Sequence, residues 1–290
     1  MIKNTQEKYN IPGNTRIGQV RLTVADLKEV TAFYREVFGF VILRSTDQET
    51  VLGTPAKIPL LLLAESPGAP KRPPGTTGLF HMAIVLPTRA DLARMLLRMQ
   101  EQNVPPRGAA DHLVSEALYL SDPEGNGIEI YRDRPKSEWE YSGNDIKMST
   151  LPLKVQELMD TLDNPHPLER IPDDTRMGHI HLNVADIEET DHFYSDILGF
   201  DVMARFGSEA TFMAAGGYHH HIGANVWNGR GASPPSDGAR GLRWFELVLP
   251  DESALNKIME RLDQNDIAFS WEDSGILVRD PSGNWVRIIS

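Results

Sequence analysis

The chain contains no cysteine among its 290 residues. This absence excludes disulfide bonds, thiolate nucleophiles, zinc fingers and iron–sulfur clusters. Any metal ion bound here must therefore be held by nitrogen and oxygen atoms, which makes the nine histidines and the carboxylates the candidate ligands.

Long apolar runs are also missing. The longest strongly apolar run covers residues 58–64, whereas a helix needs about 20 such residues to cross a bilayer. Residues 1–10 are polar and lack the apolar core of a signal peptide. We therefore expect a cytoplasmic protein.

Basic residues are outnumbered by acidic ones and are scattered along the chain. The formal net charge is −12, and the basic residues form no stripe along the sequence. An acidic protein repels phosphate backbones and anionic lipids, so nucleic acid and membrane surfaces are poor candidate partners. Because 40% of the residues are hydrophobic, the chain can still bury a sizeable core.

The sequence repeats itself. Residues 18–40 (GQVRLTVADLKEVTAFYREVFGF) and 178–200 (GHIHLNVADIEETDHFYSDILGF) align without a gap. A weaker pair begins at Gly78 and Gly241, and both of its members later contain Asp-Pro-x-Gly-Asn. The order A-B-A′-B′ predicts four modules of about 50 residues, at 15–66, 78–134, 175–229 and 241–290. We therefore expect a first domain at 15–134, a linker at 135–174 with a helix near 153–162, and a second domain at 175–290.

Each module shows the pattern of a strand, a helix and further strands. In the third module, Ile180 and Leu182 alternate with histidines, which is typical of a strand with one apolar face. Asp186 then stands where a helix N-cap belongs, and Gly199 predicts the turn back into a strand. The Asp-Pro-x-Gly-Asn segments predict tight turns between the last two strands. Together these patterns indicate an α+β fold of four tandem βαβββ modules.

The shared VAD…FY…LGF signature resembles the vicinal oxygen chelate superfamily, which includes glyoxalase I, bleomycin-resistance proteins and extradiol dioxygenases. Bacterial catechol 2,3-dioxygenases are the most similar subgroup, by the strings at 111–135, 177–186 and 216–227. The resemblance implies that modules pair into cupped half-barrel sheets. It also implies that metal ligands come from the first and last strands of each module.

The candidate ligand positions are filled unevenly. Module two offers His81 and Glu129, and module three offers His179, whereas module four has Trp244 and Arg287. A guanidinium cannot ligate a cation. The resemblance therefore implies a site of two histidines and one carboxylate, as in non-haem Fe(II) enzymes, with Mn(II) as the alternative ion. This distribution favours pairing of modules 2+3 and 1+4, and the alternative is 1+2 and 3+4.

Further site residues follow from the same resemblance, although a single histidine or tyrosine is more often a packed side chain than a functional one. Tyr119, ten residues before Glu129, would hydrogen-bond a substrate oxygen. His220 would be the acid/base, but strand alternation places His219 and His221 on one face, so the choice among the three stays open. His112, in a loop over the cup, would contact substrate or support the residues that do. His181, on the face of His179, would orient His179 or contact substrate in the pocket.

The implied activity is extradiol cleavage, in which a small aromatic diol reacts with O₂ in the degradation of aromatic compounds. For the assembly we expect a homo-oligomer. The first alternative is a glyoxalase-like metal-dependent isomerase or lyase. Such enzymes favour a fourth protein ligand, where this chain offers only Asn225. The second alternative is a non-enzymatic binding protein of the bleomycin-resistance kind.

Overall fold

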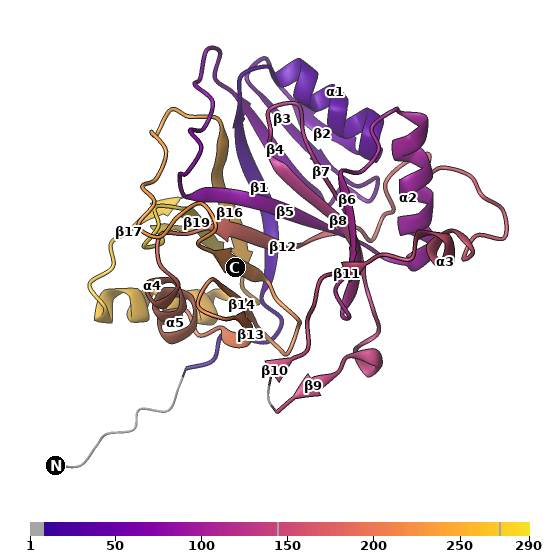
Figure 1. The fold of residues 1–290 in the computed structure, drawn as a ribbon. Coiled ribbons are helices and arrows are strands. Elements are labelled where there is room, and N and C mark those ends of the chain that lie inside the picture. The colour runs from indigo at the N-terminus through magenta and orange to yellow at the C-terminus, as the bar shows by residue number, and fades with distance from the viewer. Residues whose placement is uncertain (1–8, 144, 273) are drawn as a thin grey trace.

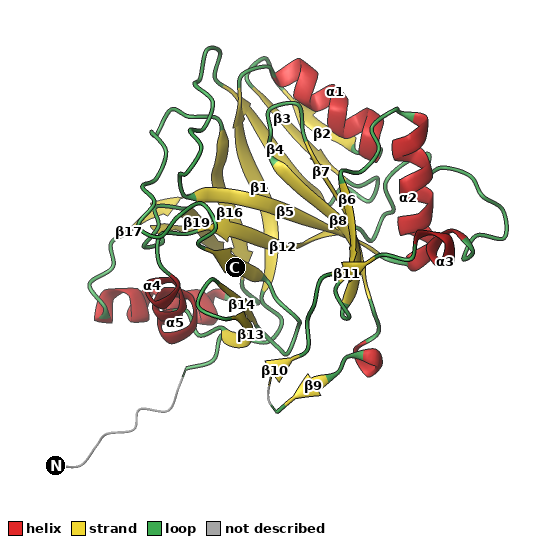
Figure 2. Ribbon diagram, in the orientation of Figure 1, coloured by secondary structure: helices red, strands yellow, loops and turns green. Residues whose placement is uncertain are grey.

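The computed structural model describes residues 9–143, 145–272 and 274–290 (Figures 1 and 2). Modules one and two each fold as a strand, a helix and three further strands. Module one consists of β1 (Arg16–Val24), α1 (Leu27–Phe38), β2 (Val41–Ser45), β3 (Glu49–Gly53) and β4 (Pro59–Glu65). Module two consists of β5 (Gly78–Leu86), α2 (Arg89–Glu101), β6 (Gly108–Asp111), β7 (Ser115–Ser121) and β8 (Gly127–Asp133).

Modules three and four repeat this order, so the predicted α+β fold of four βαβββ modules is confirmed. Module three consists of β12 (Arg176–Asn183), α4 (Ile187–Asp191) with a π-helical continuation (His192–Ile197), β13 (Asp201–Phe206), β14 (Ala210–Ala214) and β15 (Ile222–Asn225). Module four consists of β16 (Gly241–Val248), α5 (Glu252–Gln264), β17 (Phe269–Glu272), β18 (Gly275–Arg279) and β19 (Trp285–Ile289).

The strands form two large curved sheets, and each sheet takes modules from both halves of the sequence. In the nine-stranded sheet the order is β11-β6-β7-β8-β5-β12-β15-β14-β13, and in the eight-stranded sheet it is β17-β18-β19-β16-β1-β4-β3-β2. Strand β5 pairs with β12, and β1 pairs with β16, both antiparallel. Modules two and three therefore share one sheet, and modules one and four share the other, which agrees with the pairing favoured by the ligand distribution.

The apolar core lies between the two sheets and under the helices. Strand β1 lies against β12, α1 packs beside α2, and α5 packs beside the helix of module three (Figure 1). The alternation on β12 sets its two faces, because Ile180 and Leu182 are buried in this core while His179 and His181 face the other way. Within the described residues, no helix is long and apolar enough to cross a membrane.

Helix starts follow the predicted capping chemistry. The Asp186 side chain accepts a hydrogen bond from the Glu189 amide at 3.0 Å, and Asp26 does the same for Glu29 at 2.8 Å. Gly199 adopts a left-handed φ of 88°, which confirms the predicted turn.

The linker is less helical than its spacing predicted. It contains a 3₁₀ turn (Lys136–Glu138), the short strands β9 (Tyr141–Ser142), β10 (Asp145–Ile146) and β11 (Leu151–Pro152), and α3 (Val155–Met159). The expected helix over residues 153–162 is thus confined to five residues. Its end is marked by the Thr161 hydroxyl, which donates to the Leu158 carbonyl at 2.7 Å, and a turn follows.

Two equivalent buried tyrosines tie neighbouring modules together. Tyr34 donates to Asp122 in the turn of module two, and Tyr194 donates to Asp280 in the turn of module four at 2.9 Å. Each aspartate also accepts backbone amides of its own Asp-Pro-x-Gly-Asn turn. Contacts between a helix and a turn therefore join module one to module two and module three to module four. Strand pairing instead joins module two to module three and module one to module four.

Replacement Tyr194→Phe should lower the free energy of unfolding by about 2 kcal/mol, because it removes a buried hydrogen bond to a carboxylate. Urea denaturation followed by circular dichroism would measure the change. Tyr141→Phe is the matched control, since Tyr141 is 50% exposed and its change should stay within about 0.5 kcal/mol. Equal midpoints for the two variants would contradict the anchoring role of Tyr194.

Candidate metal centre

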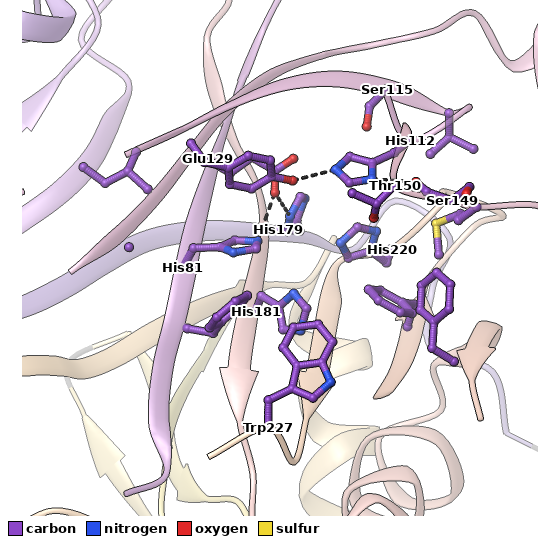
Figure 3. A pocket seen from close by; sticks show the side chains of 18 of the residues that line it. His81, His112, Ser115, Glu129, Ser149, Thr150, His179, His181, His220 and Trp227 are labelled. Carbon is purple, nitrogen blue, oxygen red and sulfur yellow. Dashed lines mark hydrogen bonds and ion pairs between the residues drawn. The ribbon is translucent and has the colours of Figure 1, made fainter. Parts of the chain in front are cut away.

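A cavity of about 630 Å³ opens in the cup of the nine-stranded sheet (Figure 3). Its walls combine apolar and aromatic side chains with a small group of polar ones. All seven site residues predicted from the sequence line it: His81, His112, Tyr119, Glu129, His179, His181 and His220.

The register of three adjacent strands brings His81, Glu129 and His179 together. Strand β5 lies between β8 and β12, and its Ala83 is opposite Glu129 on one side and His179 on the other. His81 is two residues from Ala83 and therefore faces the same side of the sheet. Residues distant in the sequence thus project from the centre of one sheet.

The atoms of this group converge closely. Glu129 Oε2 lies 3.0 Å from His81 Nε2 and 3.2 Å from His179 Nε2, and the candidate ligand atoms all lie within 4.8 Å of one another. Metal–ligand distances of about 2.1 Å and right angles place neighbouring ligand atoms about 3 Å apart. All three residues are buried. His81 Nε2, although close to Glu129, does not meet the geometry of a hydrogen bond with it or with any other described residue. The three residues therefore fit a divalent metal ion.

The protonation states also suit metal binding. Burial alone would raise the pKa of Glu129, but the neighbouring His179 and His81 outweigh it and hold that pKa well below its usual range. Burial lowers the pKa of His179 to about 4, against the attraction of Glu129. A carboxylate and a neutral imidazole are the forms that ligate metals, and the carboxylate leaves a negative charge for a cation to compensate.

Tyr119 faces Glu129 directly across the β7–β8 pair. Its hydroxyl lies 2.6 Å from His112 Nε2, and His112 Nδ1 lies 2.8 Å from the Ser149 carbonyl (Figure 3). Because a carbonyl only accepts, His112 donates from Nδ1, and Nε2 is then the atom that can accept a hydrogen bond from the Tyr119 hydroxyl. Burial and the charge of Glu129 raise the pKa of Tyr119 well above its ordinary value, so the phenol stays protonated.

The three consecutive histidines lie in the loop before β15, so the expectation that strand alternation governs them is wrong. Of the three, His220 lines the cavity, with its ring centroid 4.0 Å from that of His179. His219 lies behind it and is fully buried, and His221 turns away to accept the Ala215 amide at 3.2 Å. Burial and the neighbouring histidines hold the pKa of His220 well below its usual range.

His181 lines the cavity beside aromatic side chains that the sequence did not single out. Its Nε2 accepts from Asn225 Nδ2 at 3.0 Å, and its ring contacts Phe80 and Trp227. Two features of the sequence could have indicated these aromatic residues. Phe80 is next to the predicted ligand His81, and Trp227 is the last residue of the string at 216–227. Met148, Ser149 and Thr150 of the linker also line the cavity, and no repeat could have indicated them.

The eight-stranded sheet differs at the equivalent place. Here Glu246 on β16 lies opposite Arg287 on β19. These two positions correspond to Ala83 on β5 and Glu129 on β8 in the nine-stranded sheet. Glu246 and Arg287 form an ion pair at 2.6 Å, and the guanidinium lies 5.4 Å from the Trp244 ring centroid. Within the described residues, His81, Glu129 and His179 are the one group of three side chains that could hold a metal ion.

Comparison with known proteins agrees with this architecture. A family model for the Glyoxalase/Bleomycin resistance protein/Dioxygenase superfamily matches residues 16–130 and 176–288. A catechol-2,3-dioxygenase of Bacillus subtilis is 40% identical over 287 residues, covering 97% of this chain and 99% of that protein. A biphenyl-2,3-diol 1,2-dioxygenase of Rhodococcus globerulus is 31% identical over 120 residues, covering 41% of this chain and 63% of that protein.

Solved structures show the same fold. Glyoxalase I from Zea mays superposes with a TM-score of 0.57 at 15% identity, covering 95% of this chain and 92% of that one. The two chains therefore share a fold, and it is the vicinal oxygen chelate fold predicted from the sequence. By its repeated fold and its match along nearly the whole length, the chain belongs to the Glyoxalase/Bleomycin resistance protein/Dioxygenase superfamily.

Proposed function

We propose that the protein is an extradiol ring-cleaving dioxygenase that acts on a catechol-type diol with O₂. The observation that carries the proposal is the convergence of two imidazoles and one carboxylate at His81, His179 and Glu129. The similarity to a catechol-2,3-dioxygenase along nearly the whole chain supports the same reaction.

In this proposal the three side chains hold Fe(II), with Mn(II) as the alternative. Two neutral nitrogens and one carboxylate oxygen are the donor set typical of non-haem Fe(II) enzymes. When bound, such an ion would supply Lewis acidity toward the diol and O₂.

The remaining polar residues handle protons and orientation. His220, neutral at physiological pH, can accept a proton from a diol hydroxyl and later return it. Tyr119 donates to His112, which leaves the Tyr119 oxygen free to accept from a substrate hydroxyl. Rotation of this O–H toward the cavity would let it donate to a substrate oxygen instead. The apolar walls keep the site dry and strengthen these interactions.

The two alternatives explain less of the geometry. A glyoxalase-like reaction favours a fourth protein ligand, but Asn225 is engaged by His181 and by the Trp227 amide. A binding protein of the bleomycin-resistance kind would not require two buried imidazole nitrogens, each about 3 Å from the same carboxylate oxygen.

The metal prediction can be tested directly. His81→Gln or His179→Gln should lose bound metal, because either change removes one of three ligands, while His192→Gln should retain it since His192 is an exposed helix residue. Metal content would be measured by elemental analysis after anaerobic loading with Fe(II) and dialysis. Arg287→Ala, in the other sheet, should also retain metal. If this variant lost as much metal as the histidine variants, the site between modules two and three would be contradicted.

The reaction is tested by mixing anaerobically Fe(II)-loaded protein with catechols in air and following the yellow ring-opened product. Tyr119→Phe and His220→Gln should lower kcat by about 10²- to 10⁴-fold with metal content unchanged, because they remove proton-handling groups. Absence of turnover by the wild-type protein across a panel of substituted catechols would exclude the dioxygenase activity.

The cavity also predicts which diols are favoured. No described residue that lines it is an arginine or lysine, and its mouth carries Glu209 with the exposed aromatic rings of Phe80, Phe206 and Trp227. A carboxylate substituent would find no cation there, whereas an uncharged alkyl or aryl group would bury apolar surface. We expect kcat/KM for alkyl- and aryl-substituted catechols to exceed that for carboxylated catechols by at least about tenfold, which corresponds to about 1.4 kcal/mol. Equal values would contradict this reading of the cavity.

A further inference from the structure

A line of three hydrogen-bonded side chains runs from the cavity wall toward the surface. His220 Nδ1 lies 2.7 Å from His219 Nδ1, and His219 Nε2 lies 2.9 Å from Asp133 Oδ1. His219 has no exposed surface, whereas the Asp133 side chain is 22% exposed. The function proposed above uses His220 but neither of the two residues behind it.

Asp133 is held as an acceptor from several sides. The Tyr218 hydroxyl donates to both of its oxygens at 3.1 and 3.0 Å, and the Arg176 guanidinium lies 3.6 Å away. Asp133 also stands four residues after Glu129 on β8, so the two carboxylates project from the same face of one strand. Strand β8 thus carries both the candidate metal ligand Glu129 and Asp133, the carboxylate at the outer end of the three hydrogen-bonded side chains.

The carboxylate at one end sets the direction of every hydrogen bond in the line. Asp133 only accepts, so His219 carries its proton on Nε2. A neutral His219 then has a lone pair on Nδ1 and must accept there, so the proton between the two rings belongs to His220 Nδ1. The opposite direction would require a doubly protonated His219, which is an added charge on a fully buried ring among other histidines.

We propose that Asp133 and His219 are positioning residues that hold His220 in the tautomer with a proton on Nδ1 and a lone pair on Nε2. The Nδ1 edge of His220 is turned to His219, so the opposite edge of the ring faces the cavity that the ring lines (Figure 3). A close tilted contact with the His179 ring and an edge contact with Phe212 hold the plane of the ring. The Nε2 lone pair is thereby ready to accept a proton from an oxygen of a bound diol.

The role of this tautomer in turnover rests on the proposed function. The assignment of the tautomer rests only on the hydrogen bonds to His219 and Asp133. Transfer of a hydroxyl proton to Nε2 leaves an oxyanion on the diol and a positive charge on His220. His219 and Asp133 would stabilise that charge through the same two hydrogen bonds, without changing partners. This arrangement explains why a fully buried histidine is paired with a carboxylate behind the cavity wall.

The tautomer can be observed without turnover. Protein labelled with ¹⁵N-histidine and examined by two-bond ¹H–¹⁵N correlation spectra should show His220 protonated on Nδ1. His219→Phe keeps an aromatic ring in the same packing but removes the hydrogen bond, so His220 should shift toward a mixture of tautomers. Tyr218→Phe is the control, because it removes one donor to Asp133 and leaves His219 in place, and it should preserve the wild-type signal.

Kinetics of the Fe(II)-loaded protein with catechol provide the second readout. His219→Phe should lower kcat by about 10- to 100-fold, with KM for the diol and metal content little changed. His219→Gln should restore much of the loss, since its amide can donate to Asp133 and accept from His220 Nδ1. A packing role alone would instead make Phe the better replacement for this buried ring.

Two results would overturn the positioning role. One is a wild-type His220 protonated on Nε2, and the other is an unchanged His220 tautomer in His219→Phe. If the tautomers behave as expected but the wild-type protein turns over no diol, the positioning role is supported and the dioxygenase proposal fails instead.

Discussion

The antiparallel pairing of β5 with β12 is the contact on which the site depends. It joins the two halves of the sequence at the centre of the nine-stranded sheet, and its register places His179 opposite Ala83 and His181 opposite His81. A slip of one residue would turn both histidines of β12 into the apolar core. Ile180 and Leu182, which fill that core, oppose the slip because their burial requires the observed face. The same alternation that folds the sheet therefore aims the candidate ligands.

Burial makes the orientation of each ring in the cup depend on a partner behind it. Neutral imidazoles in a low-dielectric site need hydrogen bonds that fix which nitrogen carries the proton. The Ser149 carbonyl accepts from His112, and the Asn225 amide donates to His181. In each ring this partner decides which nitrogen donates a hydrogen bond and which accepts one. The cavity thus presents lone pairs and protons in set directions before any substrate arrives, which lowers the reorganisation that a reaction would require.

Much of this arrangement could be predicted from the sequence because the repeats align equivalent strand positions. The modules and the capping aspartates follow from that alignment, whereas the seven predicted site residues that line the cavity also needed the family resemblance. The histidine loop could not be predicted by alternation, because Gly216 and Gly217 adopt left-handed φ values of 60° and 66° and end the strand before it. Neither the linker wall at Ser149 nor the partnership of Asp133 with His219 leaves a local signal, since each joins segments far apart in the sequence.

The two sheets show how one scaffold can balance a buried carboxylate in two ways. In the eight-stranded sheet Glu246 stands where the other sheet has Ala83, and it fills the centre of the cup beside Gly18. Its charge is balanced by the guanidinium of Arg287, and it also accepts a hydrogen bond from the backbone amide of Gln19 at 2.8 Å. In the nine-stranded sheet the small Ala83 leaves that centre open, and the carboxylate moves to Glu129, where two imidazoles can share a cation with it. Since a buried carboxylate needs a positive partner, a guanidinium supplied by the chain stabilises one cup, whereas in the proposed metal site a cation from solution would take that role.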